Sequence, residues 1–255
     1  MDLKRQKINI LGVNVDDISQ STAVECILRL AEGRDRGHFV ATVNSEFIML
    51  ARKDKEFAHV LLRADLAVAD GWWVAFSKLI LGGKYHQRIT GVDLVGKLCR
   101  ESSEKVIAVG FLGGFGSVAE MVAKRQKAAN RQLRVVFAGS GDPAIGYDLR
   151  LKKTLDKAGR VDILFVAYGM GQQEFWIERN RNKLNVGVYI GVGGAFDYLA
   201  GVKIRAPKWV QNAGFEWLFR LVLEPHRLWR MRVLPIFFGL IVMEKLRRLV
   251  NRPIS

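Results

Sequence analysis

Short apolar runs that end at glycine or at a small polar residue recur along the chain, and segments with helical periodicity separate them. The runs are rich in β-branched residues, whereas residues 46–64 place their apolar side chains at helical spacing. Apolar strands that alternate with helices are typical of a parallel sheet covered on both faces. The pattern therefore predicts an α/β, Rossmann-like fold with a mainly parallel sheet. The expected strands are residues 38–45, 66–71, 105–114, 133–141, 161–169 and 186–197, with a further strand and turn in residues 7–17.

The pattern changes near residue 205. Residues 1–204 form the expected α/β core, whereas residues 205–255 contain no strand-like run, little glycine and frequent tryptophan and arginine. We therefore expect a basic, helical C-terminal appendage that docks on a membrane, although its apolar residues could instead pack on the α/β core or form a subunit contact. Residues 233–243 are an uncharged, mostly apolar run between two groups of basic residues. At about 1.5 Å per helical residue, such a run covers only about half of a ~30 Å bilayer core, and Pro235 and Gly239 leave its conformation open.

Composition changes this picture in two respects. The chain has 255 residues, of which 49% are hydrophobic, so it can bury a substantial core as one domain with an appendage. Its two cysteines have no metal-ligand spacing, and the opening residues MDLKRQKINI lack the apolar core of a signal peptide. We therefore expect a cytoplasmic setting in which thiols stay reduced.

The formal net charge of +15 is unevenly distributed. From Gly201 onward there are eleven Lys or Arg and three Glu residues, a surplus of eight positive charges. Such a surplus indicates a polyanionic partner, either an anionic lipid surface or nucleic acid. A basic nucleic-acid-binding protein is therefore one alternative function.

Polar residues at the ends of the expected strands are the candidate site residues, because ligands of open parallel sheets bind beyond the carboxyl ends of the strands. Asp70 follows one such strand and could act as a general base, although Asp-Gly is also a common turn. Thr42 and Asn44 project to one side of their strand, where they could contact a sugar or form ordinary strand-end hydrogen bonds.

Arg88 precedes an expected helix, and a guanidinium group can bind a diphosphate through two hydrogen bonds. A lone arginine is more often a solvated surface charge. The chain has no Asp-x-Asp pair, and its four histidines show no ligand spacing, so we expect neither a metal nor a cofactor. Arginines and backbone N–H groups would then have to stabilise a diphosphate.

Glycine-rich residues 110–117 could bind phosphate at the start of a helix, but they lack the G-x-G-x-x-G spacing of a dinucleotide site. The chain also has no G-x-x-x-x-G-K-[ST] motif, which argues against a P-loop nucleotidase. A nucleotide-binding oxidoreductase on the same fold remains the second alternative.

Six segments, taken in order, resemble the WecG/TagA/CpsF glycosyltransferase family of bacterial cell-surface polysaccharide synthesis. The resemblance spans residues 8–232. It implies an inverting, metal-independent enzyme that moves a sugar from a UDP-sugar to an undecaprenyl-diphosphate-linked sugar at the cytoplasmic face of the membrane. The segments are TVN (42–44), ADG (69–71), RITGVDL (88–94), GMGQQEFWI (169–177), GVGGAFDYLAG (191–201) and the stretch from Arg205 to Arg232.

The resemblance also implies roles for individual residues. Asp70 is the expected base and Arg88 binds the departing diphosphate. Thr42, Asn44, Gln173, Glu174, Gly191, Gly193, Gly194 and Arg205 are expected to bind substrate, with the glycines presenting backbone N–H groups to the donor. Arg220, Arg227, Arg230 and Arg232 are expected to contact the membrane or the lipid diphosphate.

The implied partners are a UDP-sugar donor, a polyprenyl-diphosphate-sugar acceptor and an anionic membrane surface, without nucleic acid. The family uses N-acetylmannosamine, its uronic acid and glucose as transferred sugars, and the sequence does not select among them. The sequence also leaves open whether the chain forms a homo-oligomer.

Overall fold

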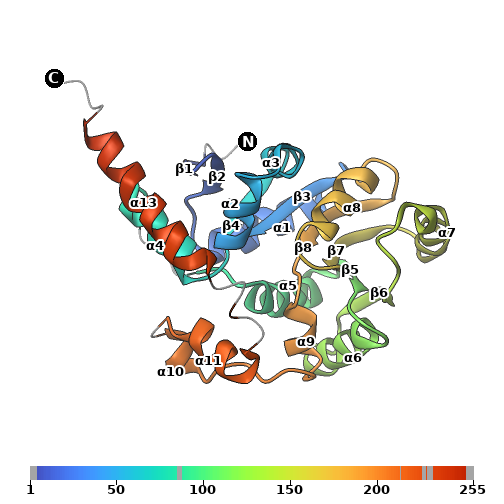
Figure 1. The fold of residues 1–255 in the computed structure, drawn as a ribbon. Coiled ribbons are helices and arrows are strands. Elements are labelled where there is room, and N and C mark those ends of the chain that lie inside the picture. The colour runs from blue at the N-terminus through green and yellow to red at the C-terminus, as the bar shows by residue number, and fades with distance from the viewer. Residues whose placement is uncertain (1–4, 85–87, 213, 226–227, 229–231, 251–255) are drawn as a thin grey trace.

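A six-stranded parallel sheet forms the centre of the molecule (Figure 1). The computed structural model describes residues 5–84, 88–212, 214–225, 228 and 232–250. Neighbouring strands lie in the order β4-β3-β8-β7-β5-β6. The α/β fold with a parallel sheet is thus confirmed. The strands are β3 (His38–Val43), β4 (Leu66–Ala69), β5 (Ala108–Gly113), β6 (Arg134–Gly139), β7 (Val161–Ala167) and β8 (Val186–Gly191).

Helices cover both faces of this sheet, because alternate strand residues point to opposite sides. Val40 and Phe165 belong to the apolar layer on one face, and Phe39 and Leu164 to the layer on the other. The first layer is completed by α1 (Gln20–Glu32), α5 (Gly91–Lys105), α6 (Val118–Ala129) and α9 (Ala195–Leu199). The second is completed by α2 (Ser45–Ala51), α3 (Lys55–Leu62), α4 (Trp72–Ile80), α7 (Asp148–Ala158) and α8 (Gln172–Asn180).

Several element boundaries differ from those expected. The last strand ends at Gly191 rather than at residue 197, because residues 195–199 form α9. β5 begins later than expected, since α5 runs to Lys105 and ends at Val106, which has a left-handed φ of 57°. Residues 46–64, where helical spacing was expected, form two helices, because Asp54 caps α3 by accepting from the N–H groups of Glu56 and Phe57.

The N-terminal segment is a separate antiparallel hairpin of β1 (Lys7–Ile10) and β2 (Val13–Asp16), not part of the main sheet. The buried Lys78 of α4 joins the hairpin to the core. Its ammonium group lies 2.9 Å from Asp17 Oδ1 and donates to the carbonyl of Asp16 at 3.2 Å. The hairpin therefore positions α4, which carries one wall of the site described below.

The C-terminal segment consists of α10 (Lys208–Asn212), α11 (Glu216–Leu223) and α13 (Val233–Val250) among the described residues. The apolar run whose conformation was open is the first part of α13. Pro235 is tolerated there because it lies in the first turn, where a missing N–H removes no helical hydrogen bond. Phe237 and Ile241 are fully buried in the apolar layer that also contains α2 and α4. Among the described residues, no helix combines the length and apolarity that a bilayer span requires.

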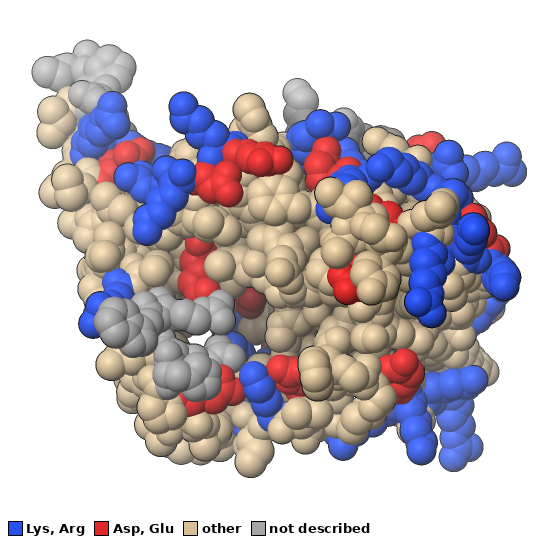
Figure 2. All heavy atoms as spheres, turned by 45° about the vertical axis from the view of Figure 1, so that its right-hand side comes forward, with Lys and Arg blue, Asp and Glu red and all other residues tan. Residues whose placement is uncertain are grey.

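The positive charge is not confined to this C-terminal segment. Figure 2 shows Lys and Arg side chains along the upper edge and the right-hand side of one face, above and beside a surface of uncharged residues. The net charge of +15 is therefore a property of the whole chain as well as of its end.

Candidate active site

The connections after β3 and β8 diverge and open a crevice at the carboxyl end of the sheet. β3 and β8 are neighbours, yet β3 leads to α2 on one face whereas β8 leads to α9 on the other. Such divergence marks the ligand site of open α/β sheets. Thr42, which is buried, lies at the base of the crevice and donates through Oγ1 to the carbonyl of Gly191 at 2.7 Å. This hydrogen bond joins the ends of the two strands.

Two adjoining hollows occupy the crevice. We call them the Asp70 hollow, of about 180 Å³, and the Gln173 hollow, of about 220 Å³. Asp70 and Arg220 line both, so they stand where the hollows meet. The residues common to both linings are Asn44, Glu46, Asp70, Thr90 and Arg220.

Asp70 directly follows β4, where its N–H donates to the carbonyl of Val43 at 2.8 Å. The next residue, Gly71, has a φ of 87° and turns the chain into α4. Residues other than glycine adopt this backbone conformation only with strain. Burial raises the pKa of Asp70 to about 6, Arg220 and Arg88 oppose that rise, and Glu216 adds to it. Near neutral pH the carboxylate is ionised yet more basic than an exposed one, as a general base requires.

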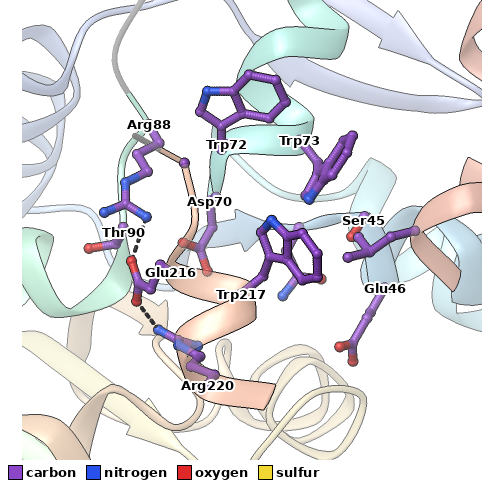
Figure 3. Close-up of a pocket in the computed structure, with 14 residues that line it drawn as sticks. Ser45, Glu46, Asp70, Trp72, Trp73, Arg88, Thr90, Glu216, Trp217 and Arg220 are labelled. Atoms are coloured by element: carbon purple, nitrogen blue, oxygen red, sulfur yellow. Dashed lines mark hydrogen bonds and ion pairs between the residues drawn. The ribbon is translucent and has the colours of Figure 1, made fainter. Parts of the chain in front are cut away.

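Two arginines beside Asp70 share one carboxylate, that of Glu216 on α11. Arg88 Nη1 donates to Glu216 Oε2 at 2.5 Å, and Arg220 Nη2 donates to Oε1 (Figure 3). Burial alone would raise the pKa of Glu216, but Arg220 and Arg88 hold it below its ordinary value. Arg220 also lies over the ring of Tyr198, with Cζ 4.8 Å from the ring centroid. The cluster therefore fixes two permanent cations next to the candidate base.

Gln173 and Glu174 brace the wall of the crevice from within. Glu174 accepts from the Gly171 N–H at 2.7 Å and from Gln173 Nε2 at 2.6 Å, while Gln173 Oε1 accepts from the Gly193 N–H at 2.9 Å. Burial raises the pKa of Glu174 to about 7. Gln173 lines the Gln173 hollow with Gly193 and Gly194, but Glu174 lines neither hollow. The Gly193 N–H, expected to face the donor, is thus already donated to Gln173.

The glycine at position 191 permits this arrangement. A Cβ there would lie 2.8 Å from Gln173 Nε2 and 2.9 Å from Glu174 Oε1, closer than real Cβ contacts come. Gly191 therefore allows the Gln-Glu pair to approach β8, and its carbonyl accepts from Thr42.

The remaining expected site residues lie in different surroundings. Asn44 lines both hollows, but its Oδ1 also accepts from the Phe47 N–H at 3.0 Å and caps α2. Arg205 lines neither hollow. It forms a two-point ion pair with Asp93 at 2.6 and 2.8 Å, which ties residue 205 to α5. Arg232 is exposed and lines neither hollow, and Arg227 and Arg230 lie outside the described residues.

The sequence reasoning missed Glu216 and an aromatic wall of the Asp70 hollow. Figure 3 shows Trp72, Trp73 and Trp217 beside Asp70, away from the guanidinium groups of Arg88 and Arg220. The i,i+4 spacing of Glu216 and Arg220 could have indicated their ion pair. No local signal links Glu216 to Arg88, which is 128 residues away in the chain.

Within the part of the chain that the structure describes, no three His, Cys, Asp or Glu side chains are arranged to hold a metal ion.

Comparison with known proteins decides the family. A family model described as "Glycosyl transferase WecG/TagA/CpsF family" matches residues 8–251. The chain belongs to this glycosyltransferase family. The sequence-based identification is therefore confirmed, and the WecG/TagA/CpsF match extends beyond residue 232 into α13.

Curated relatives of this WecG/TagA/CpsF glycosyltransferase share one name, N-acetylglucosaminyldiphosphoundecaprenol N-acetyl-beta-D-mannosaminyltransferase. The relative from Bacillus spizizenii is 31% identical over 205 residues, which cover 79% of this chain and 77% of the relative. The relative from Staphylococcus aureus strain MRSA252 is 28% identical over 243 residues, which cover 94% and 93%. The relative from Bacillus subtilis strain 168 is 29% identical over 209 residues, which cover 82% and 80%.

Proposed function

We propose that the chain transfers an N-acetylmannosaminyl group from a UDP-sugar to N-acetylglucosamine linked to undecaprenyl diphosphate. The acceptor and the transferred sugar follow the names of the relatives. The observation that carries the proposal is the position of Asp70, a carboxylate with a raised pKa at the junction of two hollows and beside two arginines. One hollow can hold the donor and the other the acceptor, with the reacting atoms meeting at Asp70.

The proposed reaction is a single displacement. Asp70 removes the proton from an acceptor hydroxyl, and the oxygen attacks the anomeric carbon from the side opposite the nucleoside diphosphate. The new glycosidic C–O bond forms as the bond to the diphosphate oxygen breaks, which inverts the anomeric centre. Asp70 then releases its proton to water. A well-placed general base contributes about 10²–10⁴-fold to such a reaction.

Arg88 stabilises the charge that develops on the departing diphosphate, and Arg220 binds the diphosphate of the acceptor. Their guanidinium groups are already oriented by Glu216, so little reorganisation is required when the charge appears. A fixed guanidinium group can thus take the place that a divalent metal has in other transferases. This arrangement supports a metal-independent reaction.

The C-terminal helix α13 is the proposed membrane dock. Its exposed apolar side chains include Ile236, Met243 and Leu246, and its last turn carries Arg247 and Arg248. An apolar surface with neighbouring basic residues suits the interface of an anionic leaflet. Docking there would bring the site to an acceptor whose diphosphate stays at the membrane surface.

Turnover of a panel of donors tests the proposal. The full chain is incubated in excess EDTA with UDP-N-acetylmannosamine, its uronic acid or UDP-glucose, and with a lipid-diphosphate-linked N-acetylglucosamine. We expect the N-acetylmannosamine donor to be used fastest and to give a disaccharide with inverted anomeric configuration by NMR. Retention of configuration, or activity that EDTA abolishes and Mg²⁺ restores, would contradict the proposed mechanism. Preference for another donor would contradict the assigned sugar.

A further inference from the structure

A third hollow, of about 470 Å³, adjoins the Asp70 hollow and is almost entirely apolar. We call it the apolar hollow. Trp72, Trp73 and Phe76 of α4 form one wall, Trp217 of α11 adds to it, and three side chains of α13, Phe238 among them, form the other. Trp72, Trp73, Trp217 and Leu234 line both the apolar hollow and the Asp70 hollow. The two are therefore one continuous depression that changes from charged to apolar.

The walls of the apolar hollow are held in place by packing. Trp72 stacks on Phe76 with ring centroids 4.7 Å apart and 14° between the planes, and Trp73 contacts Phe238 edge-on at 6.0 Å. α13 is anchored beneath the hollow by the fully buried Phe237. A hollow with such packed apolar walls next to charged groups is suited to an amphipathic ligand.

We propose that the apolar hollow binds the isoprene units that adjoin the diphosphate of the polyprenyl acceptor. This inference rests on the proposed function. The acceptor carries its sugar, its diphosphate and its apolar chain in that order. Along the depression, the carboxylate of Asp70, the guanidinium group of Arg220, and the indole and phenyl rings offer partners for all three parts.

The depression itself favours this occupant over two others. A membrane acyl chain or a second copy of the chain would fill the apolar hollow without using the charged groups that continue from it. α11 carries both kinds of wall, since Arg220 faces the charged part and Trp217, less than one turn away, borders the apolar part. A ligand with a diphosphate directly joined to an alkenyl chain uses both.

The function of the subsite would be to hold the acceptor in register. Binding energy from a part of the substrate that does not react can be used to position the part that does. A bound tail would fix the distance between the sugar hydroxyl and Asp70. Loss of the tail contact should therefore reduce use of prenylated acceptors more than use of tail-free ones.

Binding without transfer gives the first test. Geranyl diphosphate, methyl diphosphate and inorganic diphosphate are titrated against the full chain, with tryptophan fluorescence as the readout, since three of its six tryptophans line the apolar hollow. We expect geranyl diphosphate to bind at least tenfold more tightly than methyl diphosphate. Phe76→Ala and Phe238→Ala should bring that ratio toward one. Leu79→Ala, a change at an exposed residue of α4 outside the hollow, should keep it.

Transfer to soluble acceptors gives the second test and removes the membrane from the comparison. N-acetylglucosamine linked through a diphosphate to a geranyl or a methyl group is used, and the ratio of the two kcat/KM values is measured. We expect wild type to favour the geranyl acceptor at least tenfold. The two phenylalanine variants should lower this ratio, and Leu79→Ala should not.

Each other result overturns one specific statement. Equal affinity for geranyl and methyl diphosphate, or equal losses for both ligands in Phe76→Ala and Phe238→Ala, would overturn the subsite. Quenching by anionic phospholipid vesicles that geranyl diphosphate does not displace would assign the hollow to membrane lipid. A dimer that Phe238→Ala dissociates would assign it to a second copy. If geranyl diphosphate binds as expected but no sugar is transferred, the prenyl-diphosphate site stands and the proposed function fails.

Discussion

The strand-end half of the site and the C-terminal half are held in place by different interactions. Thr42 lies on a buried strand and Gln173 on a helix, and their side chains form hydrogen bonds with the backbone of neighbouring elements. Asp70 directly follows β4 and is held by its own backbone N–H. Glu216 and Arg220 belong to α11, which is joined to the core by the ion pair of Glu216 with Arg88 and by the contact of Arg220 with the ring of Tyr198. The candidate base is therefore held in place by backbone hydrogen bonds, whereas the position of the neighbouring cations depends on ion pairs.

Besides the mostly buried pair of Arg88 with Glu216, two partly exposed ion pairs attach the C-terminal half. Arg205 pairs with Asp93, and Lys203 lies 3.3 Å from Glu224. Pairs of this kind contribute about 1 kcal/mol or less each. Burial of one large apolar side chain contributes about 1.5–3 kcal/mol. We therefore expect substitutions in the strand-end half to abolish catalysis. Substitutions in the C-terminal half should instead reduce activity by smaller factors.

Asp70→Asn should give the largest effect. The amide keeps the shape of the side chain but cannot take a proton, so kcat should fall by about 10²–10⁴-fold, while the circular dichroism spectrum stays close to that of wild type and the thermal midpoint does not fall. Asp35→Asn, at an exposed loop residue, is the matched control and should keep full activity. An Asp70→Asn variant within threefold of wild type would remove Asp70 from the base role.

Phe237→Ala tests whether α13 is part of the core. Phe237 is fully buried, so its truncation should lower the free energy of unfolding by about 3–5 kcal/mol in urea titrations. Ile236→Ala changes the adjacent residue, which is 57% exposed, and should cost no more than about 0.5 kcal/mol. Similar small losses of unfolding free energy in both variants would show that α13 packs only loosely on the core. The two halves would then differ in their attachment more than the structure indicates.

Removing two charges from α13 tests the membrane dock. Lys245 and Arg247 lie near its end, and each basic residue near an anionic leaflet contributes about 1 kcal/mol. The double change to Gln should weaken binding to phosphatidylglycerol vesicles by about 30-fold in co-sedimentation. The control is the double change of Lys124 and Lys127 to Gln. These two lysines are exposed on α6, and their replacement should have little effect on vesicle binding. Equal losses in the two double variants would indicate attraction by total charge rather than docking through α13.

Arg88→Lys tests the geometry of the cation cluster. Lysine keeps the charge but cannot reach Glu216 and Gln211 through two fixed N–H groups as the guanidinium does. We expect kcat/KM to fall about 10-fold or more with folding intact. The exposed Arg100 provides the control, since Arg100→Lys should be neutral. A fully active Arg88→Lys variant would mean that charge alone, without orientation, suffices.

The same contrast explains what the sequence could predict. Buried parallel strands are continuous apolar runs, so the sheet and the strand-end residues Thr42 and Asp70 could be placed from the pattern alone. The course of α13 could not be predicted. Proline is compatible with the first turn of a helix but not with its interior, and the sequence does not show where the helix begins. The partners of Arg88 and Arg205 lie far away in the chain, and only the fold brings Glu216 and Asp93 to them. Residues assigned to substrate by resemblance, such as Arg205 and Glu174, prove to be engaged with protein groups.

Glu216→Gln tests the electrostatic coupling between the two halves and should have the smallest effect on activity. As a general base, Asp70 must be ionised, so kcat/KM should fall about tenfold per pH unit below its pKa of about 6. The negative charge of Glu216 is one of the groups that raise this pKa. Its removal leaves Arg88 and Arg220 less neutralised, and both cations favour the ionised form of Asp70. The acid limb of the pH profile should therefore move to lower pH by about half a unit to one unit.

The same pKa shift affects stability. Folding raises the Asp70 pKa above its ordinary value of 3.8, so ionising Asp70 lowers the free energy of unfolding as the pH rises from about 4 to about 6. The Glu216→Gln variant should reduce that loss as well. Glu101→Gln, at a surface ion pair that lines none of the three hollows, should leave the limb in place. An unshifted or upward-shifted limb in Glu216→Gln would show that the C-terminal half does not set the basicity of the strand-end half.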